Sequence, residues 1–302
     1  MFFRNLTFFR FPSTLNAALA ALDERLGEHP LKPVGPLDLS SRGFVSPFGR
    51  DEPALSHAVR DCTWVTLGGE DRLLPGAVVN EALARKLAEI ESQQGRKLGG
   101  KARKQLKDDL IHDMLPKAFV KGSRTSASID SKQGVITVDA SSKKAAESVV
   151  SELRHAMGSF PAVPVNAEVS VRAVMTAWLA GEALPDGLVL GDECELKDPV
   201  DGGAVVRAQR QDLQADEILK HLDTGKQVSK LALVLDDRLS FVLGEDLVVR
   251  KLKFLDGAVD ALENTERDSL HAELDARYAL FSGEVHTLFA VLEKALKLSR
   301  AE

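Results

Sequence analysis

Three strand patterns in the C-terminal third of the chain constrain the fold most strongly. The segments 227–235, 239–244 and 247–254 are rich in apolar residues, and only two or three residues separate each from the next. Parallel neighbours need a connection of about a dozen residues or more, so strands this close together pair antiparallel. We therefore expect an α+β fold with mixed, mainly antiparallel sheets and packed helices, and not a doubly wound α/β fold.

The rest of the chain alternates between strand and helix patterns. Residues 1–11 predict a central strand, because phenylalanines occupy both of its faces. Further strands are expected at 43–48, 61–68, 118–130, 134–139, 187–196 and 203–209. Helices are expected at 13–26, with Ser13 as the N-cap, and at 75–94, 100–115, 142–157, 170–181, 214–223 and from about 255 onwards.

The segment 158–166 contains two prolines and is the best candidate for a domain boundary. We expect an N-terminal α+β domain over 1–165, which includes a helical arm at 74–116. A C-terminal α+β domain over 166–302 is expected to end in helices.

Composition narrows the class of protein. The chain has 302 residues, of which 44% are hydrophobic and 28% charged, which is enough apolar residue for substantial cores. Its two cysteines, Cys62 and Cys194, lie far apart, so we expect no disulfide framework, no cysteine zinc site and a reducing compartment. The apolar N-terminus is interrupted by Arg4 and Arg10, and no apolar run is long enough to cross a bilayer. We expect a cytoplasmic protein without membrane contact.

Signatures of common catalytic and cofactor sites are missing. The chain contains no GxGxxG, GxxxxGKS/T, HExxH or GxSxG, and its seven histidines are scattered without ligand spacing. We therefore expect no enzyme activity, no cofactor and no metal. Two carboxylate pairs keep a metal-dependent nuclease open as an alternative: Asp130 with Asp139, which flank a predicted hairpin, and Asp236 with Asp237, which we expect to form a polar turn.

Charge is segregated along the chain, although the net charge is only −6. Every charged residue between Ser92 and Lys107 is positive, whereas 256–275 is dominated by aspartate and glutamate. A basic helical segment suits phosphate binding, which needs positive charge along a surface rather than one fixed spacing. The alternative is a solvated helix face. The cations predicted to contact phosphates in this segment are Arg96, Lys97, Lys101 and Lys104.

Two strand segments offer further cations. In the sequence VVRKLKF, Lys251 and Lys253 are expected to point outward about 7 Å apart while the alternate residues face a core; the alternative is an ordinary exposed strand face. Arg207 and Arg210 are expected at the end of a strand that leads into a helix N-terminus near Leu213, where arginines can meet a phosphate.

A third basic segment surrounds an aromatic residue directly after Pro116. Lys117, Lys121 and Arg124 flank Phe119. Phe119 is either a contact point among cations or a core residue at the start of a strand, and the sequence favours neither.

A series of motifs resembles the RdgC family of recombination-associated proteins. They run in the same order over essentially the whole chain, and this collinearity is more specific than any one motif. The motifs are FFRNLTFFR near the N-terminus, GFVSPFG at 43–49, LLPGAVVNEAL at 73–83, MLPKAFVKGS at 114–123, GVITVDASSKKAAE at 134–147, GSFPAVP at 158–164, GGAVVRAQRQDL at 202–213, KLALVLDDRLSFVL and RKLKF.

The resemblance implies a bacterial, nucleoid-associated protein without catalytic activity. It implies a ring-shaped homodimer that encloses double-stranded DNA with little sequence preference and binds single-stranded DNA more weakly. It further implies that the bound protein limits access of the RecA recombinase to DNA, and so acts negatively on recombination and in replication-fork processing. A protein-interaction scaffold that uses the acidic C-terminal helices is a third hypothesis, beside the nuclease.

The resemblance also assigns residues. A dimer gate corresponds by motif to Phe119 on one side and to Arg210 with Gln211 on the other. Arg210 stands where the family commonly has a lysine, and Gln209 stands where another cation can occur. The DNA contacts expected overall are Arg96, Lys97, Lys101, Lys104, Lys117, Arg207, Arg210, Lys251 and Lys253.

Overall fold

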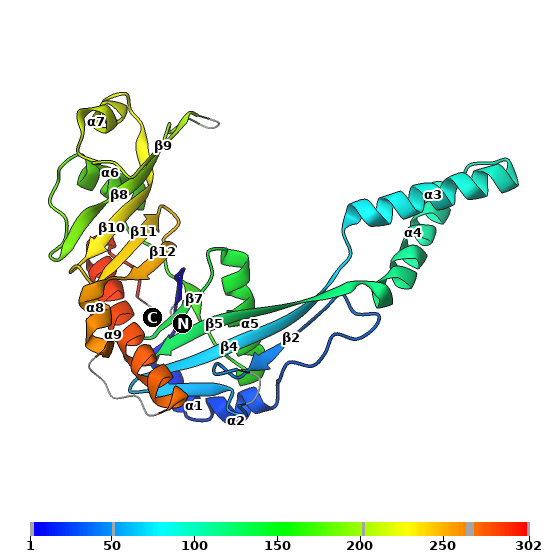
Figure 1. Cartoon of the computed structure of the whole chain (residues 1–302), viewed down its shortest axis with the longest axis horizontal. Helices are drawn as coiled ribbons and strands as arrows, with labels where there is room; N and C mark the ends of the chain where they lie inside the picture. The colour runs from blue at the N-terminus through cyan, green and yellow to red at the C-terminus, as the bar shows by residue number, and fades with distance from the viewer. Residues whose placement is uncertain (1–2, 50–51, 201–202, 264–268, 301–302) are drawn as a thin grey trace. The chain divides into compact units, whose positions relative to one another are not determined.

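A computed structural model describes residues 3–49, 52–200, 203–263 and 269–300. The first two residues of the strand expected at 1–11, and the acidic positions Glu266 and Asp268, lie outside these ranges. The expected α+β class with antiparallel sheets is confirmed (Figure 1). No helix within the described ranges is long and apolar enough to span a membrane.

The backbone divides into two compact units. The first unit consists of Met1–Glu28, Ser46–Thr66 and Thr125–Glu302, and the second of His29–Val45 and Leu67–Arg124. Two of the four boundaries fall inside long strands, β4 (Cys62–Leu73) and β5 (Phe119–Asp130). The expected boundary near residue 165 would separate two domains that each fold independently. Compact units of the backbone do not test this, so the boundary stays a prediction.

A seven-stranded sheet has the order β2-β4-β5-β6-β1-β7, with β3 also paired to β4. Its remaining strands are β1 (Thr7–Arg10), β2 (Ser40–Val45), β3 (Ser56–Val59), β6 (Val135–Val138) and β7 (Val163–Pro164). All four residues of β1 are buried, and β1 lies between β6 and β7, so the expected central strand is confirmed in shorter form. Strand β3 had not been predicted.

The helix expected at 13–26 is broken. A 3-10 turn at Ser13–Leu15 is followed by two short helices, α1 (Asn16–Leu19) and α2 (Leu22–Gly27), and Ser13 does not cap any of them. Only the second half of the apolar stripe is buried, at Leu22 and Leu26, because α2 packs against α5 (Lys143–Met157). The first half has no burial to hold a continuous helix together.

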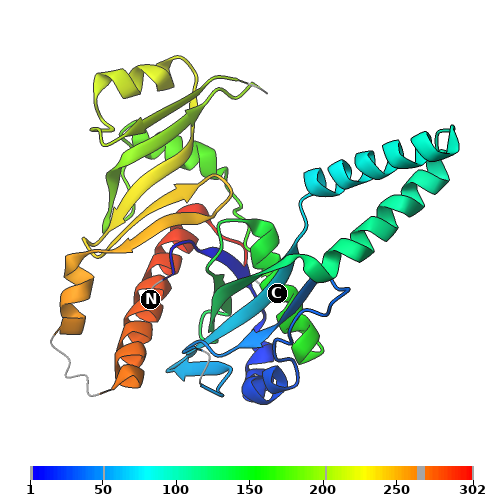
Figure 2. The same ribbon diagram turned by 45° about the vertical axis from the view of Figure 1, so that its right-hand side comes forward.

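The five-stranded sheet of the first unit follows the sequence patterns closely (Figure 2). Its order is β12-β11-β10-β8-β9, and neighbouring strands pair antiparallel. The strands are β8 (Leu188–Lys197), β9 (Val205–Gln209), β10 (Gln227–Leu235), β11 (Leu239–Gly244) and β12 (Val249–Phe254). Asp236 and Asp237 form the expected tight turn, both at φ 52°.

One face of this sheet is the core side. Helix α6 (Val171–Leu179) packs against β10, and residues such as Leu231 and Phe241 are 0% and 2% exposed. Burying a large apolar side chain in this way stabilises the folded state by roughly 2 kcal/mol relative to leaving it exposed. The other helices of the C-terminal half are α7 (Asp216–Asp223), α8 (Asp256–Glu263) and α9 (Leu270–Leu296).

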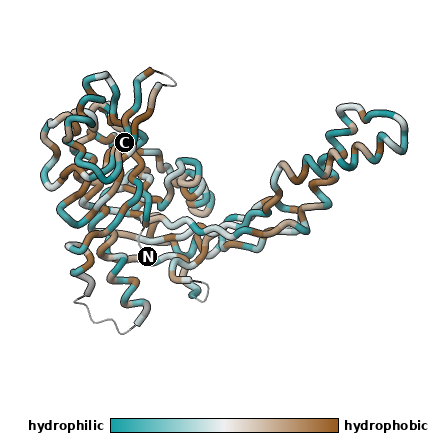
Figure 3. The backbone as a smooth tube through the Cα atoms, turned by 45° about the horizontal axis from the view of Figure 1, so that its top comes forward, coloured by the Kyte–Doolittle hydropathy of each residue, from teal (hydrophilic) through white to brown (hydrophobic). Residues whose placement is uncertain are grey.

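The second unit contains a helical hairpin (Figure 1). Helix α3 (Gly76–Gln94) ends at Gly95, whose φ of 65° needs glycine, and α4 (Gly100–Met114) packs back against α3. Val79 and Leu83 are buried, whereas Val78 is 45% exposed. Hydrophilic residues gather around the connection between the two helices (Figure 3).

Candidate nucleic-acid interface

The predicted basic segment surrounds the connection of the helical hairpin. Arg96 and Lys97 lie in that connection, outside any helix, and Lys101 and Lys104 lie in the first turns of α4; all four are exposed. Lys97 Nζ is 3.9 Å from Glu91 Oε1, a loose contact between two exposed side chains. The backbone amides at the start of α4 add the positive end of a helix dipole to these cations. This end of the hairpin can therefore attract phosphate.

Phe119 begins strand β5 and is 84% exposed, so the alternative of a core residue is wrong. Lys117 is exposed in the short 3-10 turn just before it, Leu115–Lys117. Arg72 fixes this junction: its guanidinium donates to the carbonyl oxygens of Leu115 and Ala118 at 2.9 and 3.4 Å. A large aromatic side chain is thus presented to solvent from a rigid base, as a contact residue needs.

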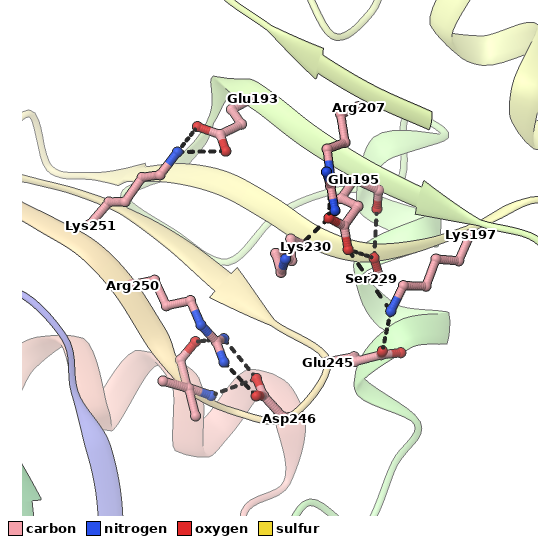
Figure 4. Close-up of polar contacts among 11 residues, drawn as sticks. Glu193, Glu195, Lys197, Arg207, Ser229, Lys230, Glu245, Asp246, Arg250 and Lys251 are labelled. Carbon is pink, nitrogen blue, oxygen red and sulfur yellow. Dashed lines mark hydrogen bonds and ion pairs between the residues drawn. The ribbon is translucent and has the colours of Figure 1, made fainter. Parts of the chain in front are cut away.

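A buried carboxylate organises the polar face of the five-stranded sheet (Figure 4). Glu195 on β8 is 5% exposed and accepts hydrogen bonds from Arg207 Nε at 2.8 Å, Ser229 Oγ at 2.9 Å and Lys230 Nζ at 3.1 Å. Burial alone would raise the pKa of Glu195, but these three donors outweigh it and lower the pKa to about 2. The carboxylate is therefore ionised at every physiological pH.

Two further carboxylates, in the turn between β11 and β12, are also paired. Glu245 accepts from Arg172 Nε at 2.6 Å and lies 3.5 Å from Lys197 Nζ. Asp246 accepts from both terminal nitrogens of Arg250, at 2.9 and 2.6 Å. The face and this turn therefore mix cations with fixed anions.

Lys251 and Lys253 are both exposed on β12 while Leu252 between them is buried, as the sequence predicts, but Lys251 is paired with a carboxylate. Lys251 Nζ contacts both carboxylate oxygens of Glu193, at 2.7 and 2.6 Å. Strand β12 is irregular at this point, where Lys251 has a φ of 54°. Lys253 is exposed and forms no ion pair with any residue that the structure describes.

Arg207 and Arg210 are placed differently from the prediction. Arg207 lies within β9 and pairs with Glu195, while helix α7 begins only at Asp216, so neither arginine sits at a helix N-terminus. Arg210 is exposed just after β9, at a φ of 56°. The backbone amide of Gln211 donates to the carbonyl oxygen of Asp192 at 3.3 Å, and this bond fixes the segment against β8.

The carboxylates of the nuclease hypothesis have structural partners. Asp130 accepts from the backbone amides of Lys132 and Gln133, both at 2.9 Å, and lies 2.8 Å from His286 Nδ1. Asp139 accepts from the amides of Arg4 and Asn5, and burial raises its pKa. Across the described ranges, no three His, Cys, Asp or Glu side chains converge as a metal site.

Sequence reasoning missed the anions of the sheet face. Glu193 and Glu195 lie in the strand expected at 187–196, and the sequence pattern assigns them no role. One signal was present: Glu195 stands between Cys194 and Leu196 in a strand pattern, and a carboxylate in such a place needs cations on the neighbouring strands. Which cations pair with it depends on strand order, which no local pattern gives.

Comparison with known proteins adds a full-length relationship. A family model described as "RdgC: Putative exonuclease, RdgC" matches residues 1–299. The chain is 64% identical to the recombination-associated protein RdgC of Xanthomonas axonopodis pv. citri, over the whole length of both chains. It is 64% identical to the protein of that name from Xanthomonas campestris pv. campestris and 58% identical to that from Stenotrophomonas maltophilia, again over both full lengths. The similarity therefore spans both compact units.

Proposed function

The chain belongs to the RdgC family, as its motifs predict, and on that premise we propose that it binds double-stranded DNA as a homodimer without sequence preference. Family membership associates the chain with recombination.

One observation supports DNA binding most directly: the exposed cations at the end of the helical hairpin. All four are exposed; Arg96, Lys101 and Lys104 form no ion pair in the described part of the chain, and Lys97 makes only the loose 3.9 Å contact with Glu91. Cations free of carboxylates release counterions from DNA when they bind phosphate, which gives affinity that does not depend on sequence. On the five-stranded sheet, Lys253 and the outer side of Arg207 extend the proposed contacts, and Lys117 extends them beside Phe119.

The experiment for this proposal compares two double variants of the same hairpin. Lys101→Gln with Lys104→Gln removes two free cations, and binding to unrelated duplexes should weaken equally, with a salt slope lower by about 2. Arg85→Gln with Lys86→Gln is the control, because these cations already pair with Glu81 and Glu89 at 3.1 and 2.8 Å. Equal effects of the two double variants would refute the hairpin contact.

The homodimer is proposed from Phe119. The Phe119 side chain is 84% exposed, so burying it against another surface would be favourable. The family resemblance pairs it with Arg210 and Gln211 of a second subunit. A closed dimer that surrounds DNA would place negative charge outside and positive charge inside, which agrees with a net charge of −6. We propose that this dimer encloses the duplex and binds single-stranded DNA more weakly.

In the cell, a protein bound along duplex DNA would occupy the nucleoid and compete with the RecA recombinase for the same substrate. We propose this negative action on recombination, also at replication forks, without a catalytic step. The family model carries the word exonuclease, so a magnesium-dependent cleavage assay with Asp236→Asn as control is the direct test of catalysis. Partner capture without DNA would instead favour the scaffold hypothesis.

A further inference from the structure

The ion pair between Glu193 and Lys251 crosses the middle of the five-stranded sheet. Glu193 lies on β8 and Lys251 on β12, and the strand order places β10 and β11 between them. The lysine nevertheless reaches both carboxylate oxygens, at 2.7 and 2.6 Å. The two side chains therefore bridge the polar face of the sheet (Figure 4).

Both members of this bridge occupy irregular positions in their strands. Cys194 pairs with Leu231 and Leu190 with Leu233, so β8 carries extra residues between these pairs, Glu193 among them. Strand β12 carries one extra residue next to Lys251, between the partners of Ser240 and Val242. Bulges redirect side chains and are common near functional sites.

The backbone at Lys251 supports a functional role for the bridge. Its φ of 54° lies in the left-handed region, which a residue with a Cβ enters only at a cost. With this backbone conformation, Lys251 forms its ion pair with Glu193. Strain of this kind persists where the rest of the fold holds it in place.

The bridge is exposed enough to open. The Lys251 side chain is 57% exposed and that of Glu193 is 25% exposed, whereas Glu195 nearby is 7% exposed and held by three donors. Exposed ion pairs are weak, so a phosphate group arriving at the face can replace Glu193 as the partner of Lys251. Glu195, in contrast, stays with its cations.

We propose that Glu193 competes with DNA phosphate for Lys251, so that this ion pair limits the affinity of the sheet face for duplex DNA. This inference rests on the proposed DNA binding. It adds Glu193 as a residue that lowers the affinity for DNA. A protein that must slide along or leave DNA benefits from such a limit, because each free cation strengthens binding to every sequence.

The test compares Glu193→Gln with Asp192→Asn by fluorescence anisotropy on a 30-base-pair duplex over a salt series. Asp192 is exposed on the same strand and has no ion pair within the described residues, so its substitution removes the same charge without releasing a lysine. Glu193→Gln should bind about two- to five-fold more tightly than Asp192→Asn, with a salt slope steeper by about 0.9. In a Lys251→Gln background, Glu193→Gln should give no such gain.

Equal affinities and slopes for the two single variants would overturn the inference while leaving DNA binding intact. Absence of binding by the unmodified protein would instead refute the proposed function, and the inference with it. A measurement without DNA checks the release directly: a water-soluble succinimidyl ester should acylate Lys251 faster in Glu193→Gln than in Asp192→Asn. Equal acylation rates would also overturn the inference.

Discussion

Replacing Glu195 with glutamine should destabilise the protein by about 2–3 kcal/mol at neutral pH. The folded state lowers the pKa of this carboxyl from 4.5 to about 2, and each pKa unit corresponds to about 1.4 kcal/mol, which gives about 3 kcal/mol as an upper bound. Glutamine keeps an acceptor oxygen for part of the donor set, so the observed loss should be somewhat smaller.

The stabilisation by Glu195 should decrease as the pH falls. Because the folded pKa is depressed, the stabilisation is complete above pH 4.5 and is lost as the pH falls from 4.5 toward 2. Urea denaturation followed by circular dichroism should therefore show a difference between wild type and Glu195→Gln that shrinks to less than half between pH 7 and pH 3. Glu193→Gln is the control and should cost less than about 1 kcal/mol, since its pair is exposed. A Glu195→Gln effect below about 0.5 kcal/mol, or one that does not change with pH, would refute the reasoning.

Three further predictions follow from the same contacts. Phe119→Ala should weaken self-association in sedimentation experiments while leaving the melting temperature unchanged, because the side chain is 84% exposed; a lower melting temperature with unchanged association would contradict a gate. Arg72→Ala should speed hydrogen exchange at the backbone amides between Leu115 and Phe119, because Arg72 holds the carbonyl oxygens of Leu115 and Ala118; equal exchange would show that Arg72 is dispensable there. Burial raises the pKa of Cys62 to about 12 and that of Cys194 to about 11, so iodoacetamide at pH 8 should label neither thiol before denaturation, as mass spectrometry can check.

The strands of the C-terminal sheet could be predicted because local pattern and burial agree there. Strands expected at 227–235 and 239–244 match β10 and β11 residue for residue. Alternation identified one face as core, and the short connections fixed antiparallel pairing. The turn at Asp236 and Asp237 followed from the same pattern.

The parts that failed depend on tertiary contacts. The apolar stripe at 13–26 satisfies helical spacing, but only Leu22 and Leu26 find a partner surface, and the helix breaks before them. Lys251 is exposed, as strand alternation predicts, yet its pairing with a carboxylate three strands away depends on a bulge and on the strand order. Neither a bulge nor a strand order can be derived from residue spacing alone.

In the candidate site, too, local patterns predicted some features, whereas others depend on tertiary contacts. The free cations of the helical hairpin could be predicted because exposure follows from the polar composition of 92–107. The cations of the sheet could not be assigned, since Arg207 and Lys251 contact carboxylates that lie far from them in sequence. Charge runs therefore indicated where cations are, and the structure indicates which of them are neutralised.

The most direct test of the account is binding of the unmodified protein to unrelated 30-base-pair duplexes across a salt series. Phosphate-dominated binding predicts similar affinities for all sequences and a linear, steep fall of log affinity with log salt concentration. Absence of binding at low salt, or an affinity that depends on sequence rather than on salt, would contradict the central claim.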